Sequence, residues 1–141
     1  MTAQGEDILA YLDRAITATE RTAHAAADAV GGDRWSGADR EVVVDLPGGD
    51  IIADGVTYGD MYEPMKQQAS DHIALNDPAS VLRRCAADRK LIALHGPVGE
   101  WDLGCKGCGF NNQEESMVDR YQDCPVLRAL AEGYGWTEGE R

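Results

Sequence analysis

Residues 105–109 read Cys105-Lys106-Gly107-Cys108-Gly109, a Cys-x-x-Cys pair with glycine before, inside and after it. Because glycine adopts backbone angles that other residues avoid, the chain can turn tightly enough here for both sulfurs to approach one ion. This pattern is typical of a zinc knuckle. It predicts that the C-terminal half of the chain is organised around a bound metal.

The surroundings of the pair favour a metal site over redox chemistry. In thioredoxin-like proteins a helix begins inside the Cys-x-x-Cys motif, within a βαβ unit, whereas glycine-rich loop flanks this pair. Residues 1–7 contain no basic segment, and no apolar run has the length of a signal sequence or a membrane span, so we expect a cytoplasmic protein. Cysteines stay reduced in that compartment, and clustered thiols there indicate metal ligands before disulfides.

Tetrahedral zinc needs two further ligands, and Cys124 is the natural third. It lies at the start of a predicted helix, where the positive end of the helix dipole favours a thiolate. The fourth ligand is either His95 or Cys85. These two residues are ten apart on one predicted helix, or about 15 Å at 1.5 Å per residue, so both cannot bind the same ion.

His95 is the favoured fourth ligand because it lies where the helix turns into the knuckle loop. Cys85 lies in mid-helix on the apolar stripe, an ordinary place for a buried, unreactive thiol. The sequence therefore predicts one structural Zn²⁺ bound by His95, Cys105, Cys108 and Cys124. Two alternatives stay open: Cys85 in place of His95, and no metal, with His95 capping its helix and the thiols free.

Apolar residues recur at helical spacing in four stretches. The first runs from Ile8 to about Val30 and is stopped by Gly31-Gly32, and the third has an N-cap candidate at Asn76-Asp77 followed by proline at its first position. In that third helix Val81, Leu82, Cys85, Arg89 and Ile92 share one face, which Leu91 and Leu94 are expected to widen. The other two predicted helices are Glu63–Leu75 and Cys124–Ala131.

Short β-branched runs predict a small sheet. Residues 41–45 and 51–53 are expected to pair around the turn at 46–50, and 56–58 to add a third strand after Asp54-Gly55. The fold class is therefore α+β, mainly helical, with about four helices, a small antiparallel hairpin or three-stranded sheet, and a zinc-knuckle loop within 96–123. We expect one zinc-stapled domain over residues 1–136 and a flexible tail over 137–141.

Charge restricts the kind of partner. The chain has 25 acidic and 13 basic residues, a formal net charge of −12, which repels nucleic-acid phosphates and anionic membranes. Residues 33–63 hold eight acids against two arginines. The one local excess of positive charge is Arg83, Arg84, Arg89 and Lys90 in the third helix, and such a stretch is usually a solvated helix face.

No catalytic set emerges from the sequence, so we expect a protein that is not an enzyme. Three thiolates and an imidazole close a tetrahedral ion, whereas a catalytic zinc keeps one position for water. The zinc deaminases pair His-x-Glu with Pro-Cys-x-x-Cys, and the stretch that begins at His95 lacks that glutamate. His24 and His72 stand alone, and we find no phosphate-binding glycine loop and infer no small-molecule substrate.

Three segments together resemble a known family. They are Asp71–Arg83, Arg89–His95 and the stretch Cys124-Pro125-Val126-Leu127-Arg128-Ala129-Leu130-Ala131. In these segments the chain is similar to a family of small actinobacterial and actinobacteriophage proteins of unknown function, family 6221. The resemblance implies a phage or prophage origin and a soluble accessory protein, but it brings no known activity and no functional residue.

Two roles follow from these observations. The first is non-enzymatic binding of a host or phage protein, and the acidic surface permits a sharper version in which carboxylates imitate nucleic acid at a basic site. The alternative is a zinc-dependent nucleic-acid-binding protein that uses the Arg83, Arg84, Arg89 and Lys90 helix. An enzyme that uses the metal comes third.

Overall fold

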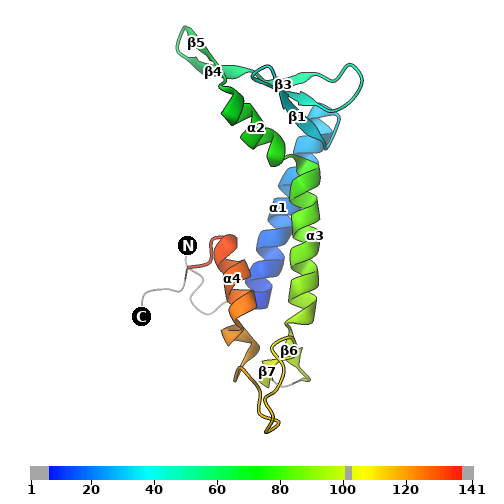
Figure 1. The fold of residues 1–141 in the computed structure, drawn as a ribbon, viewed down its shortest axis with the longest axis vertical. Helices are drawn as coiled ribbons and strands as arrows, with labels where there is room; N and C mark the ends of the chain where they lie inside the picture. The colour runs from blue at the N-terminus through cyan, green and yellow to red at the C-terminus, as the bar shows by residue number, and fades with distance from the viewer. Residues whose placement is uncertain (1–6, 101–102, 138–141) are drawn as a thin grey trace. The chain divides into compact units, whose positions relative to one another are not determined.

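A computed structural model of the chain describes residues 7–100 and 103–137. It has the predicted α+β fold, with helices and small antiparallel sheets (Figure 1). The helices are α1 (Ile8–Val30), α2 (Gln67–Leu75), α3 (Pro78–Leu94) and α4 (Pro125–Gly133), with a 3-10 turn η1 (Tyr121–Asp123). The strands are β1 (Trp35–Ala38), β2 (Glu41–Val44), β3 (Ile51–Ala53), β4 (Gly55–Tyr58), β5 (Met61–Pro64), β6 (Pro97–Val98) and β7 (Leu103–Cys105).

The chain divides into two compact units, which we describe separately. The knuckle unit comprises residues 1–18 and 85–141, and the sheet unit comprises residues 19–84. The expectation of one zinc-stapled domain stays a prediction. Of the expected tail, residues 138–141 lie outside the described part of the chain.

The core of the knuckle unit joins the first turns of α1 to α4 and to two cysteines. Ile8 and Leu12, one helical turn apart, are buried against Leu127 of α4. The same cluster includes the buried residues Cys105, Tyr121, Cys124 and Ala131. The chain has a single phenylalanine, and this core is small. The sulfurs of Cys105 and Cys124 therefore make up part of its packed interior.

Asp7 fixes where α1 begins and ties that end to η1. Its Oδ1 accepts hydrogen bonds from the backbone N–H groups of Leu9, at 2.7 Å, and Ala10, at 3.3 Å, which is N-capping. Its other oxygen accepts a hydrogen bond from the hydroxyl of Tyr121. A residue that the sequence marked only as acidic therefore links two segments 114 positions apart.

A three-stranded antiparallel sheet in the order β1-β2-β3 forms the centre of the sheet unit. Val42 and Val44 of β2 are buried, and α2 packs against β1 and β2. A Cβ on Gly37 would lie 3.0 Å from the backbone of Ser70 and of Asp71, so glycine is what lets α2 approach β1 this closely.

The second half of the sheet unit differs from the sequence prediction. The third strand of the sheet is β1, not residues 56–58, which instead pair with β5 in a separate hairpin. Residues 63 and 64 are extended, so α2 begins at Gln67 and not at Glu63. β1 escaped prediction because its turn to β2 is Asp39-Arg40, with φ of 50° and 68°, and this pair is far less diagnostic of a tight hairpin than Asn-Gly.

Asp77 and Pro78 start α3 as predicted. The Oδ1 atom of Asp77 accepts the N–H of Ser80 at 2.7 Å, and Pro78 occupies the first helical position. Of the predicted apolar face, Cys85 is buried and the others are half-buried. Leu91 and Leu94 are 37% and 61% exposed, however, so they do not widen that face.

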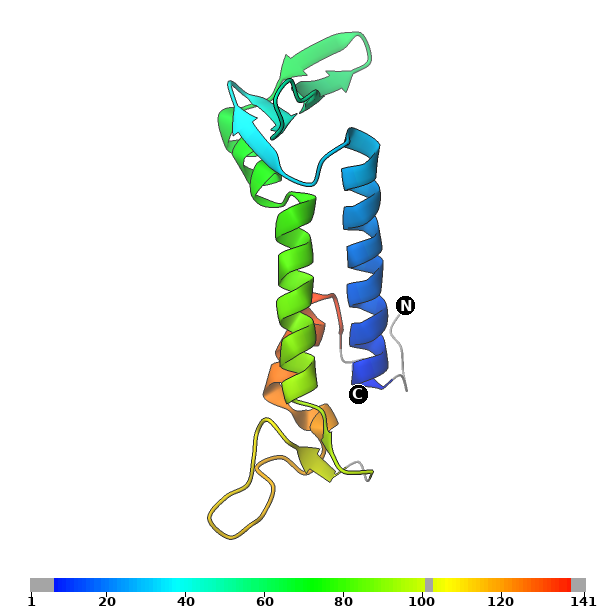
Figure 2. The ribbon, with the colours of Figure 1, turned by 90° about the vertical axis from the view of Figure 1, so that its right-hand side faces the viewer.

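Residues 96–123 are not loop throughout. β6 and β7 pair antiparallel directly after α3, and η1 precedes α4. Figure 2 shows β6, β7 and the irregular segment after them continuing from the C-terminal end of α3. This short pairing brings the knuckle back toward His95.

Candidate metal centre

His95 lies one residue beyond the end of α3, where its backbone N–H still bonds to the carbonyls of Leu91 and Ile92, at 3.0 and 3.2 Å. Gly96 and Pro97 follow and end the helix, as their residue types predict. The helix therefore fixes the backbone from which the imidazole projects. His95 is half-buried.

The Cys-x-x-Cys pair begins at the last residue of β7. Cys105 pairs with Pro97 across the β6–β7 ladder, and the N–H of Lys106 bonds to the carbonyl of Gly96 at 3.1 Å. The chain then turns, and the N–H of Gly109 returns to the carbonyl of Cys105 at 3.2 Å. These bonds place the knuckle directly against the end of α3.

Cys124 occupies the N-cap position of α4, and Pro125 fills the first helical position. Its backbone N–H bonds to the carbonyl of Tyr121, so η1 fixes the entry into the helix. Cys124 and Cys105 are fully buried, and Cys108 is half-buried.

The structure brings the four predicted ligands together. His95 Nδ1 lies 3.5 Å from the sulfur of Cys105, 3.9 Å from that of Cys108 and 3.4 Å from that of Cys124. The sulfurs of Cys108 and Cys124 are 3.6 Å apart, and all four ligand atoms lie within 4.8 Å of one another. Three sulfurs and one imidazole nitrogen therefore converge from three segments and can hold a metal ion.

The pKa values of Cys105 and Cys108 in this cluster are shifted in opposite directions. Burial opposes ionisation of Cys105, but hydrogen bonds from the backbone N–H groups of Cys108 and Gly107 and from the neighbouring thiols outweigh it and lower its pKa. Burial, followed by the hydrogen bonds with Cys124 and Cys105, raises the pKa of Cys108 to about 12. Ionisation of Cys105 is thus favoured, whereas ionisation of Cys108 is opposed. A bound cation would offset that opposition by stabilising both thiolates.

Cys85, the competing fourth ligand, lies elsewhere in the knuckle unit. It is 1% exposed, and its sulfur is 3.8 Å from the hydroxyl of Tyr134, which in turn donates to Asp88 at 2.7 Å. The group of four ligand atoms does not include it. The sequence argument for His95 over Cys85 agrees with this placement.

The arginines in the basic stretch of α3 make hydrogen bonds to neighbouring side chains. Arg89 pairs with Asp13 at 2.9 Å and donates to Thr17 at 3.0 Å, both on α1. Arg83 donates to the hydroxyl of Ser80, and Arg84 to the side-chain oxygen of Asn76. Arg83, Arg84 and Arg89 are thus each engaged by a neighbouring side chain.

Fold and site together define a small α+β protein with a Cys₃His cluster of the kind that binds a metal. The chain belongs to a family of unknown function, DUF6221, whose sequence model matches residues 5–135. No curated protein and no solved structure matches it.

None of the helices within residues 7–100 and 103–137 has the length and apolar character needed to cross a bilayer.

Proposed function

We propose that this chain is a non-enzymatic binding protein whose knuckle unit is held together by one structural zinc ion. The ligands are His95 through Nδ1 and the thiolates of Cys105, Cys108 and Cys124. The observation that carries the proposal is the mutual distance of these four atoms. When bound, the ion supplies cross-linking, not reactivity.

The distances fit zinc. Bonds of about 2.3 Å to sulfur and about 2.0 Å to nitrogen around a tetrahedral ion place neighbouring ligand atoms about 3.5 to 3.8 Å apart. The separations between His95 Nδ1 and the three sulfurs are 3.4 to 3.9 Å, and the sulfurs of Cys108 and Cys124 are 3.6 Å apart. Soft thiolates in a tetrahedral arrangement with imidazole select zinc over magnesium or calcium.

A closed set of protein ligands supports a structural role. Four protein atoms fill a tetrahedron and leave no position for the water that a catalytic zinc activates. Two of the four, Cys105 and Cys124, are also members of the hydrophobic core. An ion held there connects the end of α3 to the start of α4.

Binding to a protein is the role that this architecture supports best. The net charge of −12 disfavours nucleic acid and anionic membranes, and the engagement of Arg89 by Asp13 speaks against the nucleic-acid alternative. We propose a host or phage protein as the partner, and an accessory role in a phage or prophage, as the family resemblance implies.

Metal analysis of the purified full-length protein tests the site. We expect about one equivalent of zinc in the wild type, loss of that zinc in His95→Ala, and retention in the matched variant Cys85→Ala. Protein without bound transition metal contradicts the proposal, and so does loss in Cys85→Ala with retention in His95→Ala.

A binding assay tests the role. Incubated with a lysate of the host cell, the zinc-loaded chain should form a stoichiometric complex with one protein. A monomer that binds nothing contradicts the proposal, as does one that shows hydrolase or transferase activity.

A further inference from the structure

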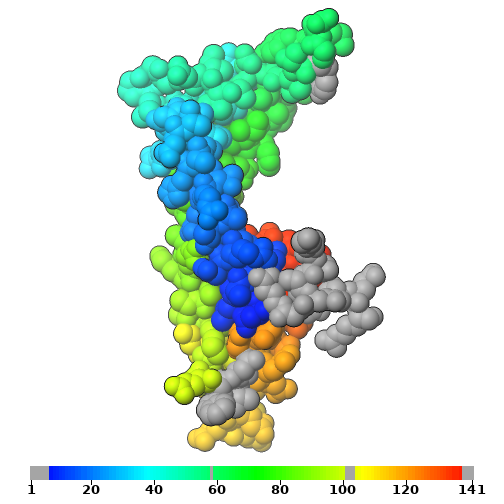
Figure 3. Space-filling model, turned by 180° about the vertical axis from the view of Figure 1, so that it is seen from behind, coloured from blue at the N-terminus to red at the C-terminus, as the bar shows by residue number. Residues whose placement is uncertain are grey.

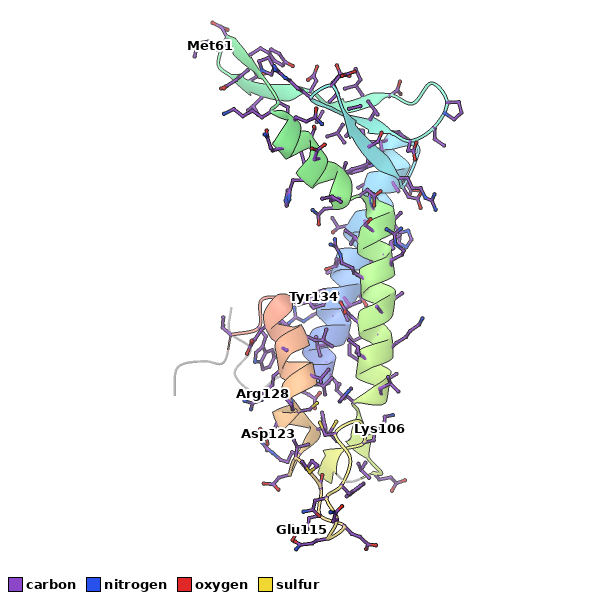
Figure 4. All side chains as sticks on the ribbon, in the orientation of Figure 1. Met61, Lys106, Glu115, Asp123, Arg128 and Tyr134 are labelled. Carbon is purple, nitrogen blue, oxygen red and sulfur yellow. The ribbon has the colours of Figure 1, made fainter. Side chains whose placement is uncertain are left out.

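The hairpin formed by β4 and β5 is a surface that the knuckle site does not explain. Both strands lie in the sheet unit, and all four residues of β5 are exposed. Figure 4 shows Met61 at the tip of this hairpin, and in the space-filling view of Figure 3 its residues project from the sheet and α2. A two-stranded hairpin is marginally stable in water by itself, so contact with a partner would stabilise this one.

Large apolar side chains are concentrated on and beside this hairpin. Met61 is 72% exposed, Tyr62 54% and Val56 49%. Of the ten large apolar side chains exposed in the described part of the chain, these three fall within the ten residues 55–64. Tyrosine and methionine are enriched at protein interfaces, and such a concentration marks an interaction surface.

The side chain of Tyr62 is fixed in one conformation by contacts within the hairpin. Its hydroxyl donates to the backbone carbonyl of Asp54 at 3.0 Å, and its ring lies over Gly55, where an added Cβ would be 2.7 Å from the ring. A side chain already fixed in one conformation loses little entropy when a partner covers it.

The negative charge of residues 41–64 indicates the chemistry of the partner surface. Residues 41–64 contain six carboxylates and no lysine, arginine or histidine. Within residues 7–100 and 103–137, none of the six takes part in an ion pair. The carboxylates are Glu41, Asp45, Asp50, Asp54, Asp60 and Glu63.

The same negative charge disfavours other binding partners of the hairpin. A second copy would bring the carboxylates of Asp54, Asp60 and Glu63 against their own counterparts, and nucleic acid and anionic membranes carry the same sign. A cationic protein surface with an apolar recess satisfies both the exposed side chains and the charge.

We propose that the β4–β5 hairpin inserts into a recess in a basic surface of another protein, so that Val56 and Met61 on one face and Tyr62 on the other are its apolar contacts, with Asp54, Asp60 and Glu63 around the contact. This inference rests on the proposed function, because it names the surface and the partner class of the same binding protein. The zinc site and the docking hairpin belong to different units of the chain.

Photo-crosslinking in the full-length, zinc-loaded protein tests this proposal. p-Benzoylphenylalanine replaces Tyr62 in one variant and Phe110 in a matched control, since these aromatic residues are 54% and 56% exposed. After irradiation in host lysate, we expect the Tyr62 variant alone to form a discrete adduct, whose sequenced peptide is rich in lysine and arginine. The adduct should fall about tenfold between about 0.05 M and about 0.5 M NaCl, and about tenfold on adding Met61→Ser.

Any result other than these contradicts the proposed docking of the β4–β5 hairpin. These outcomes are an adduct from the Phe110 variant alone, an acidic or neutral peptide, a crosslink between two copies of this chain, a nucleic-acid adduct, and insensitivity to salt or to Met61→Ser. A stoichiometric partner that crosslinks only through residue 110 overturns this inference and leaves the proposed function standing. No complex and no adduct overturns both.

Discussion

Gly107 lies directly against the imidazole of His95. A Cβ added at residue 107 would stand 2.6 Å from His95 Nδ1 and 2.6 Å from the carbonyl oxygen of Leu94, closer than a real Cβ approaches other heavy atoms. The glycine inside the Cys-x-x-Cys pair is therefore what lets the end of α3 aim its nitrogen at the three sulfurs. Gly107 therefore shapes the candidate metal site without supplying a ligand.

Gly107→Ala should weaken zinc binding by at least about tenfold, because the methyl group must displace either the imidazole or the backbone at Leu94. The measurement is competition for zinc with a chromophoric chelator. Gly96→Ala is the matched control, since a Cβ there meets nothing closer than Lys106 Cε at 3.6 Å, an ordinary contact. Equal affinities of the two variants would show that the knuckle accommodates the methyl group.

Removing the metal should loosen the knuckle unit and spare the sheet unit. Cys105 and Cys124 are buried beside Leu12 and Leu127. Without the cation, like groups remain crowded together inside this core. In hydrogen exchange after chelation, amides of α4 should lose protection while those of β2 keep theirs. Uniform loss across both units would mean that they unfold together.

The parts of the fold that the sequence predicted are those set by local chemistry. The bounds of α1 followed from the spacing of Ile8, Leu12 and Ile16 and from the glycines after Val30, and they are confirmed. The start of α3 followed from Asp77 and Pro78 for the same kind of reason. Caps, stops and apolar spacing act over a few residues, so a sequence displays them directly.

The parts that escaped prediction depend on distant contacts. The sequence places Glu63 and Pro64, the last two residues of β5, in the helix that ends at Leu75, because nothing local shows that residues 61–64 pair with 55–58. Leu91 and Leu94 were expected in a core that does not reach them. The four candidate ligands, which the structure brings together, could be predicted because zinc chemistry restricts their types and spacing, but the close approach of Gly107 required coordinates.

Asp77 should contribute to the stability of the sheet unit in a pH-dependent way. Burial opposes its ionisation, but hydrogen bonds from the side chain and backbone of Ser80 and from the N–H of Trp35, with the charge of Arg83, outweigh burial and lower its pKa. A carboxyl whose pKa is lower in the folded state stabilises the fold above its unfolded value of about 3.9. That contribution is lost as the pH falls through the folded pKa.

Asp77→Ala should therefore lower the free energy of unfolding by about 1 to 2 kcal/mol at pH 7, and the difference from the wild type should shrink in acid. Urea unfolding at neutral and acid pH, followed by circular dichroism, provides the comparison. Asp45→Asn removes an exposed carboxylate from the same unit and serves as the control. A difference from the wild type that persists unchanged in acid would exclude an ionised cap.

Tyr134 should show the opposite pH dependence in the knuckle unit. Burial, then its hydrogen bonds to Asp88 and Cys85, raise the pKa of its phenol far above the ordinary value. A group whose folded pKa is raised stabilises the fold fully below its unfolded value, here about 10, and the contribution is lost as the pH rises through the folded pKa. Tyr134→Phe should cost about 1 to 3 kcal/mol at pH 7, because it leaves the carboxylate of Asp88 without its 2.7 Å partner.

Spectrophotometric titration of tyrosinate tests this directly. In the native wild type one phenol should resist ionisation until the protein unfolds in alkali, and that late component should be missing in Tyr134→Phe. Cys85→Ala removes the more distant contact, at 3.8 Å, and should retain the late phenol. If Cys85→Ala also abolishes it, the thiol of Cys85, and not the carboxylate of Asp88, is the group that holds the proton on Tyr134.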